Sequence, residues 1–522
     1  MAQLQPMEAS ARKHWSSTVW PQLLPELAER IVDCLGCNEL AVTFRCVNKA
    51  TAEHFSSPQH TTIRLSEPVP AHAFAAHWLA PGATRGLPLR QRKKLVRLVA
   101  RSGVLANLEV ALQAAGFSQA VAVAFKTAAG TGHVAMCQWI WHDSRSPVKG
   151  DYVACRSDEA LESAARGGHQ HVCEWLLAVD RDTSQHWISK AISAAASNGH
   201  LELAKWLLQQ DPLVDPAPTY VDGVAHGCDL PTLQQAWLRV RPPRYSIWQE
   251  HIITSAASSL TPDWAAKVEW LEAQGCPQTP AAAEEAAGLA DHAALQYLVP
   301  EVPVFIRDDV DDYLLDVVKG GHLAVLQTLH AAGWPLHQNA QAYAVQAART
   351  GRMDLLAWLL DTLGAEAVRL DEGLFAAAAE SGSLELLAWL QQRGCPCHRS
   401  AYLAAVGSGC EAALEWLAEQ GCPMEEGGQP YITACRNGDL AMARCLRRLG
   451  VPWGPNGKVF LGAAEGSFFL APLPLLRWLL REGCPVDDEA VEATVVRWRS
   501  EYAKCADRER ALQKQGLGLR QP

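Results

Sequence analysis

The feature that most constrains the fold is a glycine tripeptide that recurs after the same position of an expected helix. Its copies are Gly275-Cys276-Pro277, Gly333-Trp334-Pro335, Gly394-Cys395-Pro396, Gly421-Cys422-Pro423, Gly450-Val451-Pro452 and Gly483-Cys484-Pro485. The position five residues before these glycines is usually tryptophan, and this slot recurs at Trp139, Trp175, Trp206, Trp270, Trp358, Trp389, Trp416 and Trp478. Successive tryptophans lie about 31 residues apart, or at gaps that one weaker copy fills, which indicates stacked structural repeats.

A second glycine stands seven residues before most of these tryptophans, at Gly132, Gly168, Gly199, Gly351, Gly382 and Gly409. Because glycine adopts the left-handed conformation that ends a helix, we expect one short helix before it and another after it. In the clearest unit the second helix carries an apolar stripe at helical spacing, formed by Leu201, Leu203, Trp206 and Leu207. The proline of the tripeptide then prevents that helix from continuing. Each repeat is therefore predicted to be a pair of short helices.

A helix pair this short cannot bury its own apolar stripe and must stack on neighbouring pairs. The predicted fold class is all-α, with about a dozen pairs between residues 101 and 486. The units are degenerate around residues 211–262, where prolines such as Pro212, Pro216 and Pro242 lengthen the connections. Residues 487–522 are expected to form a C-terminal capping helix and tail.

Alanines precede several of the helix-ending glycines, and histidine follows them in Gly132-His133, Gly168-His169, Gly199-His200 and Gly321-His322. In this pattern the chain resembles ankyrin-repeat proteins over roughly three quarters of its length. The resemblance implies an α-solenoid that binds a protein partner with the exposed face of its first helices and has no enzymatic activity. Exposed positions that vary between repeats are the expected contacts: Arg166, Asn198, Lys319, Arg349, Glu380 and Asn437.

Ahead of the repeats, residues 21–60 have the pattern of two amphipathic helices. The second is expected to run from about Asn38 to Phe55, with Asn38 as its N-cap. The apolar positions of this segment resemble an F-box motif. That resemblance implies docking on a Skp-family adaptor of a cullin ubiquitin ligase, through Leu23, Pro25, Leu27, Ile31, Leu35, Leu40 and Val47. The alternative is that these helices only cap the first repeat, as the end of a repeat array requires.

Residues 1–20 are expected to be a flexible N-terminus, and residues 61–100 a linker with an N-terminal cap of the array. The chain has 522 residues, of which 49% are hydrophobic and 20% charged, so it is expected to be folded almost throughout. It has neither a long apolar run nor an apolar signal segment at its start, and we expect a cytoplasmic or nuclear monomer without membrane contact. A net charge of −10 argues against a general nucleic-acid binder.

Two charged runs and the cysteines have plain structural interpretations. The basic run from Arg85 to Arg101 is expected to be a solvated helix face, and the acidic run Asp308–Asp312 a solvated loop. Cys276, Cys395, Cys422 and Cys484 occupy one slot of successive repeats. The pairs Cys34/Cys37 and Cys395/Cys397 have no second pair at zinc-ligand spacing. We therefore expect structural thiols that stay free in a reducing compartment, and no zinc site.

We find no phosphate-binding glycine loop, zinc-protease motif or nucleophile elbow in the sequence. We therefore expect no catalytic residues, no metal and no cofactor. One remote alternative is a divergent enzyme or metal-binding unit within residues 212–307, where the long connections leave room for functional loops.

Overall fold

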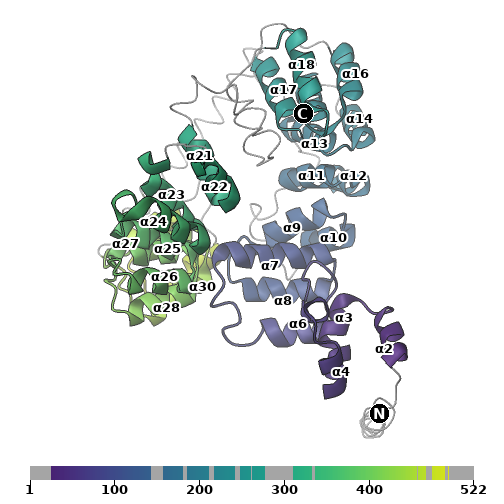
Figure 1. The fold of residues 1–522 in the computed structure, drawn as a ribbon. Helices are drawn as coiled ribbons and strands as arrows, with labels where there is room; N and C mark the ends of the chain where they lie inside the picture. Colours follow the sequence, from purple (N-terminus) through teal and green to yellow (C-terminus); the bar gives the residue numbers. More distant parts are fainter. Residues whose placement is uncertain are drawn as a thin grey trace, which may run out of the picture. The chain divides into compact units, whose positions relative to one another are not determined.

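The computed structural model of the protein is all-α in the part of the chain that it describes, which confirms the predicted class (Figure 1). The described residues are 25–142, 157–179, 185–210, 217–240, 247–259, 261–276, 310–331, 336–454, 457–465, 473–487, 489 and 492. They form 29 α-helices and no strand. The chain divides into two compact units, one of Met1–Thr84 with Arg92–Ala115 and one of Arg85–Gln91 with Gly116–Pro522.

The first unit begins with a small helical module that has its own core. Its elements are α2 (Pro25–Val32), α3 (Cys37–Val42), the 3-10 turn η2 (Phe44–Cys46), α4 (Lys49–His54) and α5 (Pro58–Thr61). Leu40, Phe44 and Phe55 are buried together, with Val32 and Leu35 packed against them. The Phe44 and Phe55 rings meet edge to face at 5.8 Å between centroids, a geometry that aromatic pairs favour.

The prediction of one helix from Asn38 to Phe55 is wrong, because this stretch is broken into α3, η2 and α4. Asn38 is not an N-cap. Its buried side chain donates to the carbonyl oxygens of Arg64, Glu67 and Pro68 and accepts from the Arg64 N–H at 2.7 Å. Asn48 is the residue that caps α4, and its side chain accepts from the Thr51 N–H at 2.8 Å. Asn38 thus joins the module to the chain that follows it.

Residues 61–100 contain more helix than a linker would, since α6 (Ala71–Trp78) and most of α7 (Leu89–Ser102) lie there. In the first unit α6 packs against α8 (Leu105–Ala115). The solvated-face prediction is wrong for Arg92, which is only 2% exposed and donates to the Ala115 carbonyl at 2.8 Å. A guanidinium satisfies the carbonyl that the end of α8 leaves without an intrahelical partner.

The second unit is a series of helix pairs. The pairs are α9 (Ala120–Gly130) with α10 (Val134–His142), α11 (Ser157–Arg166) with α12 (Gln170–Val179), α13 (Gln185–Ser197) with α14 (Leu201–Gln210), α15 (Ala217–Gly227) with α16 (Leu230–Val240), α17 (Ile247–Ala257) with α18 (Trp264–Ala273), α21 (Val310–Gly320) with α22 (Leu323–Ala331), α23 (Ala340–Thr350) with α24 (Met353–Ala367), α25 (Glu372–Ser381) with α26 (Leu384–Gln392), α27 (Arg399–Ser408) with α28 (Glu411–Glu419), α29 (Gln429–Arg436) with α30 (Leu440–Arg448), and α31 (Lys458–Glu465) with α32 (Leu473–Arg481). The 3-10 turn η4 (Leu336–Gln338) precedes α23.

The degenerate stretch around residues 211–262 still forms two ordinary pairs, α15 with α16 and α17 with α18. Of the C-terminal capping helix and tail expected over residues 487–522, the structure describes only residues 487, 489 and 492. The acidic-loop prediction is wrong for residues 310–312, which open helix α21, while Asp308 and Asp309 are not described.

First helices of consecutive pairs pack directly on one another, as α11, α13 and α15 do. Alanines line these contacts, and Ala164, Ala195 and Ala225 are fully buried. Small side chains let two helix axes approach closely, so the alanine-rich sequence selects this arrangement. The bulky apolar residues of the second helices, such as Leu203 and Leu207, complete the core.

Both kinds of glycine end their helices in the same way. The glycine has a positive φ, as at Gly199 (φ 79°) and Gly394 (φ 78°). The next residue then donates its N–H back to the carbonyl five residues earlier, from His200 to Ala195 at 2.9 Å and from Cys395 to Leu390 at 3.1 Å. This bond is the mark of the Schellman motif, which requires a residue without a Cβ at its left-handed position.

The Gly-His dipeptide also joins one repeat to the next. An added Cβ at Gly132 would lie 2.7 Å from Nδ1 of His169, and one at Gly168 would lie 2.6 Å from Cε1 of His200. At these two positions the histidine of one repeat thus fills the space over the glycine of the preceding repeat. At Gly321 the same space is taken by Arg352, whose guanidinium donates to the Gly320 carbonyl at 2.9 Å.

The tryptophan slot is less buried than its pattern predicted. Trp175, Trp206 and Trp389 are half-buried, and Trp478 is buried at 9% exposure. The tripeptide cysteines are buried as expected, and burial raises the pKa of Cys276, Cys395 and Cys484 to about 11, so these thiols stay protonated. One prediction is wrong: Cys422 forms a disulfide with Cys397 that joins two consecutive connections.

Two further segments of the second unit lie on its C-terminal pairs. Arg85 forms an ion pair with Glu415, and Arg90 donates to the Ser381 carbonyl at 2.8 Å. The Ser118 N–H donates to the Gly438 carbonyl at 2.9 Å. The end of α25 is therefore occupied by the chain itself.

Candidate partner-binding site

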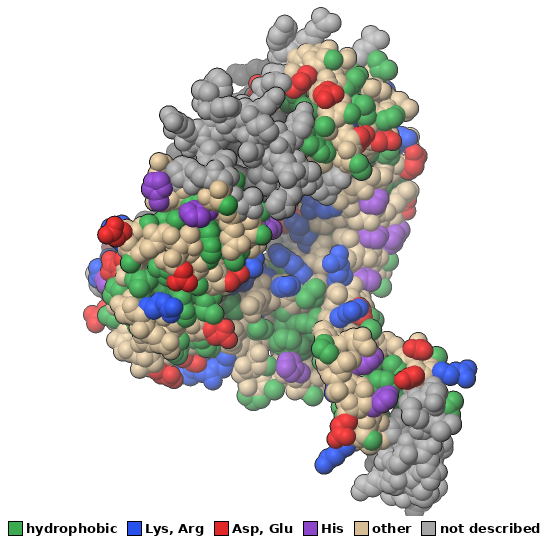
Figure 2. Space-filling view, in the orientation of Figure 1, with side chains coloured by type: hydrophobic (Ala, Val, Ile, Leu, Met, Phe, Trp, Pro, Cys, Tyr) green, Lys and Arg blue, Asp and Glu red, His purple; other side chains and the backbone are tan. Residues whose placement is uncertain are grey.

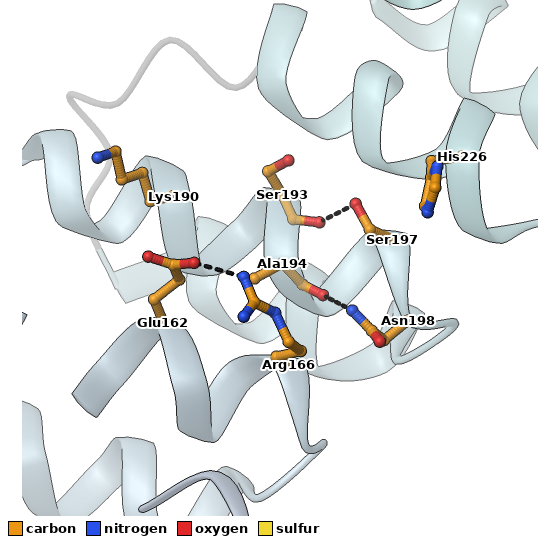
Figure 3. Close-up of a pocket in the computed structure, with 8 residues that line it drawn as sticks. All are labelled: Glu162, Arg166, Lys190, Ser193, Ala194, Ser197, Asn198 and His226. Carbon is orange, nitrogen blue, oxygen red and sulfur yellow. Dashed lines mark hydrogen bonds and ion pairs between the residues drawn. The ribbon is translucent and has the colours of Figure 1, made fainter. Parts of the chain in front are cut away.

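A hollow opens on the first helices α11, α13 and α15, at the ends where these helices meet the next turn. Its volume is about 540 Å³, and it is lined by Glu162, Arg166, Lys190, Ser193, Ala194, Ser197, Asn198 and His226 (Figure 3). Three consecutive repeats contribute to it. A volume in this range is typical of a ligand or side-chain pocket.

Helical periodicity explains why polar side chains gather there. On α11 the alanines and Leu161 face the core, and Glu162 and Arg166, one turn apart, face away from it. On α13, Lys190, Ser193 and Ser197 share a face by the same spacing. The packing of the first helices leaves these positions free to vary between repeats.

Several of these polar groups are already bonded. Glu162 and Arg166 form an ion pair at 2.5 Å, with side chains 23% and 55% exposed. The Ser197 hydroxyl donates to the Ser193 carbonyl at 2.7 Å, and the Asn198 amide donates to the Ala194 carbonyl at 2.9 Å. These bonds fix the floor of the hollow (Figure 3).

Lys190 differs from its neighbours. Its side chain is exposed, and its Nζ lies 4.4 Å from the centroid of the Trp187 ring. Among the described residues it forms no ion pair with a carboxylate. Its charge is therefore held in place by an aromatic face and remains available at the edge of the hollow.

Polar residues continue onto the next two pairs, α15 to α18. Ser255 donates to Asp222 at 2.6 Å, and burial raises the pKa of that carboxyl. His226 Nδ1 lies 3.3 Å from the Ser258 hydroxyl. The carboxylate is thus bonded to a different serine from the one His226 contacts. Among the described residues of 212–307, these groups do not form the serine, histidine and carboxylate relay that nucleophilic catalysis requires.

Lys267 lies in the same region and is fully buried. Its Nζ donates to the carbonyls of Ala225 and Cys228 at 2.6 and 2.9 Å and to the Ser259 hydroxyl at 2.7 Å. Burial lowers the pKa of this amine. Two of its bonds satisfy carbonyls at the C-terminal end of α15, and the third reaches the Ser259 hydroxyl just after α17.

The structure brings together only some of the contacts expected from sequence. Arg166 and Asn198 both line the hollow. Arg349 and Glu380, one repeat apart, form an ion pair at 2.9 Å, and Lys319 is exposed at the end of α21. The Asn437 amide donates to the Gly407 carbonyl at 3.2 Å. On the visible face of the α21–α28 region, acidic and basic side chains are interspersed (Figure 2).

Sequence reasoning missed most of the lining residues, namely Glu162, Lys190, Ser193, Ala194, Ser197 and His226. Helical spacing could have predicted some of them, because residues one or two turns before Arg166 and Asn198 lie on the same helix face. One turn before Arg166 is Glu162, and two turns before Asn198 is Lys190.

The residues expected to contact an adaptor fall into three groups: exposed, packed in the core, and outside the described residues. Leu27, Ile31 and Val47 are exposed at 44%, 37% and 39%. Leu40 is instead buried at 4%, and Leu35 is half-buried against the same core. Leu23 and the side chain of Pro25 lie outside the described residues. Only the first group remains available for a surface contact.

In the described part of the chain, one group of three side chains has metal-ligand spacing, Glu411, Glu415 and Cys445. Arg448 donates to both carboxylates, at 3.2 and 2.7 Å, and Arg85 also pairs with Glu415. These guanidiniums lower the pKa of Glu415 against the opposing effect of burial. The cluster is thus a network of ion pairs that already neutralises its acids.

No protein-family model matches the chain, and no curated protein does. None of the described helices combines the length and apolarity needed to cross a bilayer.

Proposed function

We propose that the chain is a non-enzymatic interaction protein of the ankyrin-repeat type, and that it binds a protein partner over the hollow on α11, α13 and α15. The observation that carries this proposal is the hollow itself, because three successive first helices line it with side chains that differ from repeat to repeat. Repeat proteins gain specificity in this way, from variable positions on a constant frame.

The N-terminal module supports a more specific form of the proposal. Leu27 and Ile31 lie one turn apart on α2 and are exposed, although the module has a separate core of Leu40, Phe44 and Phe55. Exposed apolar side chains that the core does not need indicate a contact with another molecule. With the F-box resemblance, the partner would be a Skp-family adaptor and the chain a substrate receptor of a cullin ubiquitin ligase.

A second candidate is a plain ankyrin scaffold whose N-terminal helices only cap the repeats. The observation that favours it is the set of bonds from Asn38 to the carbonyls of Arg64, Glu67 and Pro68. In the same unit Asn107 of α8 donates to the Val69 carbonyl at 2.8 Å. Such anchoring is what a cap needs, whereas a freely presented docking module does not require it.

The adaptor contact can be tested by affinity capture from cell extract with the full chain. We expect the wild type to retain adaptor and cullin subunits, and Leu27→Glu with Ile31→Glu to lose them, because a buried charge in the contact is costly. Ile63→Glu is the matched control, since Ile63 is exposed at 46% in the same unit outside the expected contact set. Absence of the adaptor from the wild-type sample would favour the capping role.

The repeat surface needs its own variant. Ser193→Gln places a larger neutral side chain in the hollow without removing a charge. We expect this variant to recover less of the proteins that the wild type captures. The control should lie outside the lining of the hollow. Ser255→Gln is unsuitable, because Ser255 donates a hydrogen bond to Asp222. Thr254→Gln is the better match, because Thr254 lies on α17 and is half-buried like Ser193. If Ser193→Gln retains every wild-type partner, the hollow is not the binding surface.

A further inference from the structure

The lining of the hollow has an excess of positive charge. Lys190 and Arg166 carry two positive charges, and Glu162 carries the single negative charge of the lining. Because Glu162 is paired with Arg166 at 2.5 Å, the charge of Lys190 is the one left over. The site is therefore complementary to one negative charge.

We propose that the hollow accepts a carboxylate side chain from an acidic segment of the protein partner, and that Lys190 forms its ion pair. This inference rests on the proposed function and adds the chemistry of the partner. The bound carboxylate would lie at Lys190 of α13, at the edge of the hollow and away from the Glu162–Arg166 ion pair. Ser193 follows Lys190 by about one turn on the same face of α13 and also lines the hollow (Figure 3).

The charge balance favours a carboxylate over a more highly charged group. A phosphate brings up to two negative charges, and the second would face Glu162, whose carboxylate is 23% exposed in the lining. A nucleic acid adds a charge at every nucleotide and would meet a chain whose net charge is −10. Of the two cations in the lining, Lys190 is the one for which the described part of the chain provides no acidic partner, and a single carboxylate matches its charge.

The aromatic ring beneath Lys190 makes this side chain a better anchor than an ordinary surface lysine. A flexible lysine loses rotamer freedom when it forms an ion pair, and this loss cancels much of the gain at a surface. With Nζ held 4.4 Å from the Trp187 ring centroid, part of that freedom is already lost before binding. Preorganisation of this kind increases affinity.

The size of the hollow indicates more than one side chain. Its volume of about 540 Å³ spans three repeats, from Glu162 on α11 to His226 on α15. An extended acidic segment can place one carboxylate beside Lys190 while its backbone meets the Asn198 and His226 side chains farther along. Successive repeats then read successive residues of the partner.

The test uses the full chain and a fluorescent peptide of alternating glutamate and glycine, followed by anisotropy at low salt. A peptide with glutamine in place of glutamate is the uncharged probe. We expect the glutamate peptide to bind more tightly and Lys190→Gln to weaken it about tenfold, as loss of a charge-assisted bond predicts. Lys205→Gln is the matched control, because Lys205 lies on the second helix α14 of the same repeat.

Equal binding of the two peptides, or an equal effect of Lys190→Gln and Lys205→Gln, would overturn the inference. Circular dichroism of both variants verifies that they remain folded, which we expect because both side chains are exposed. A negative result in the peptide experiment would reject the acidic ligand but not the proposed function, which the Ser193→Gln capture experiment tests separately. If Ser193→Gln loses its partners while the two peptides bind equally, the hollow is still the binding surface and only the acidic nature of its ligand is rejected.

Discussion

The contact between the glycine of one repeat and the histidine of the next predicts a difference between two glycines that look identical in sequence. Gly168 and Gly199 both have a positive φ, 75° and 79°. A Cβ at Gly199 would meet no atom within 4 Å, whereas a Cβ at Gly168 would lie 2.6 Å from Cε1 and 2.7 Å from Nδ1 of His200. Alanine at Gly199 therefore measures backbone strain alone, whereas alanine at Gly168 measures backbone strain together with overpacking against His200.

For Gly199→Ala we expect the cost of left-handed backbone alone, about 1–2 kcal/mol. For Gly168→Ala the same strain is joined by the overpacking of a filled site, typically about 1–3 kcal/mol, and the total is about 2–5 kcal/mol. In a His200→Ala background the overpacking disappears, and Gly168→Ala should again cost about 1–2 kcal/mol. The coupling between Gly168 and His200 is then about 1–3 kcal/mol.

Hydrogen exchange of the amides in α11 and α13 is the appropriate assay, because an array of repeats need not unfold in one step and a global midpoint would average over distant pairs. The four proteins of the cycle are the wild type, the two single variants Gly168→Ala and His200→Ala, and the double variant. Equal losses at Gly168 and Gly199, or a Gly168→Ala cost that persists without the imidazole, would refute the reasoning.

Two further predictions concern ionisable groups, the half-buried His169 and the fully buried Lys267. Burial, followed by the charge of His171, lowers the pKa of His169, so the unfolded chain binds the proton more tightly and stability is lost as pH falls through the unfolded value near about 6.5. His169→Gln should reduce the difference between the opening free energies of α11 and α12 measured by hydrogen exchange at about pH 7.5 and 5.5, and an unchanged difference would contradict this assignment. Lys267→Ala removes the donor of two carbonyls and a hydroxyl and should destabilise α15 by about 2–4 kcal/mol in hydrogen exchange. Lys205→Ala on an exposed surface should cost less than about 0.5 kcal/mol, and similar losses for the two would show that the buried bonds contribute little.

Helix ends could be predicted from the sequence because their cause is local. A left-handed residue needs glycine, and a proline shortly afterwards prevents the helix from continuing, so the positions of Gly199 and Gly394 define the ends directly. The burial of Cys395 and Cys484 followed from the same register. None of this depends on residues far away in the chain.

Three of the wrong predictions depend on partners far away in the chain. Asn38 has the sequence context of an N-cap, but the carbonyls it binds belong to residues 26 to 30 positions later. Arg92 lies in a basic run that suggests solvent, and the Ala115 carbonyl that buries it is 23 positions away. The Cys397–Cys422 bond depends on the approach of two connections in consecutive repeats. Periodicity contains no information about such pairs.

The candidate site was only partly predictable for a related reason. Positions next to the helix-ending glycines were expected to vary, and Arg166 and Asn198 were found that way, yet Lys190 is two turns earlier and belongs to no recurring motif. The fold requires glycine at the helix-ending turns and small side chains where the first helices pack. It places no such requirement on an exposed position of a first helix. Replacing Lys190 should therefore leave the fold intact. A residue that the fold does not require, whose ammonium is nevertheless positioned over Trp187, is the kind of residue that binding rather than stability would retain.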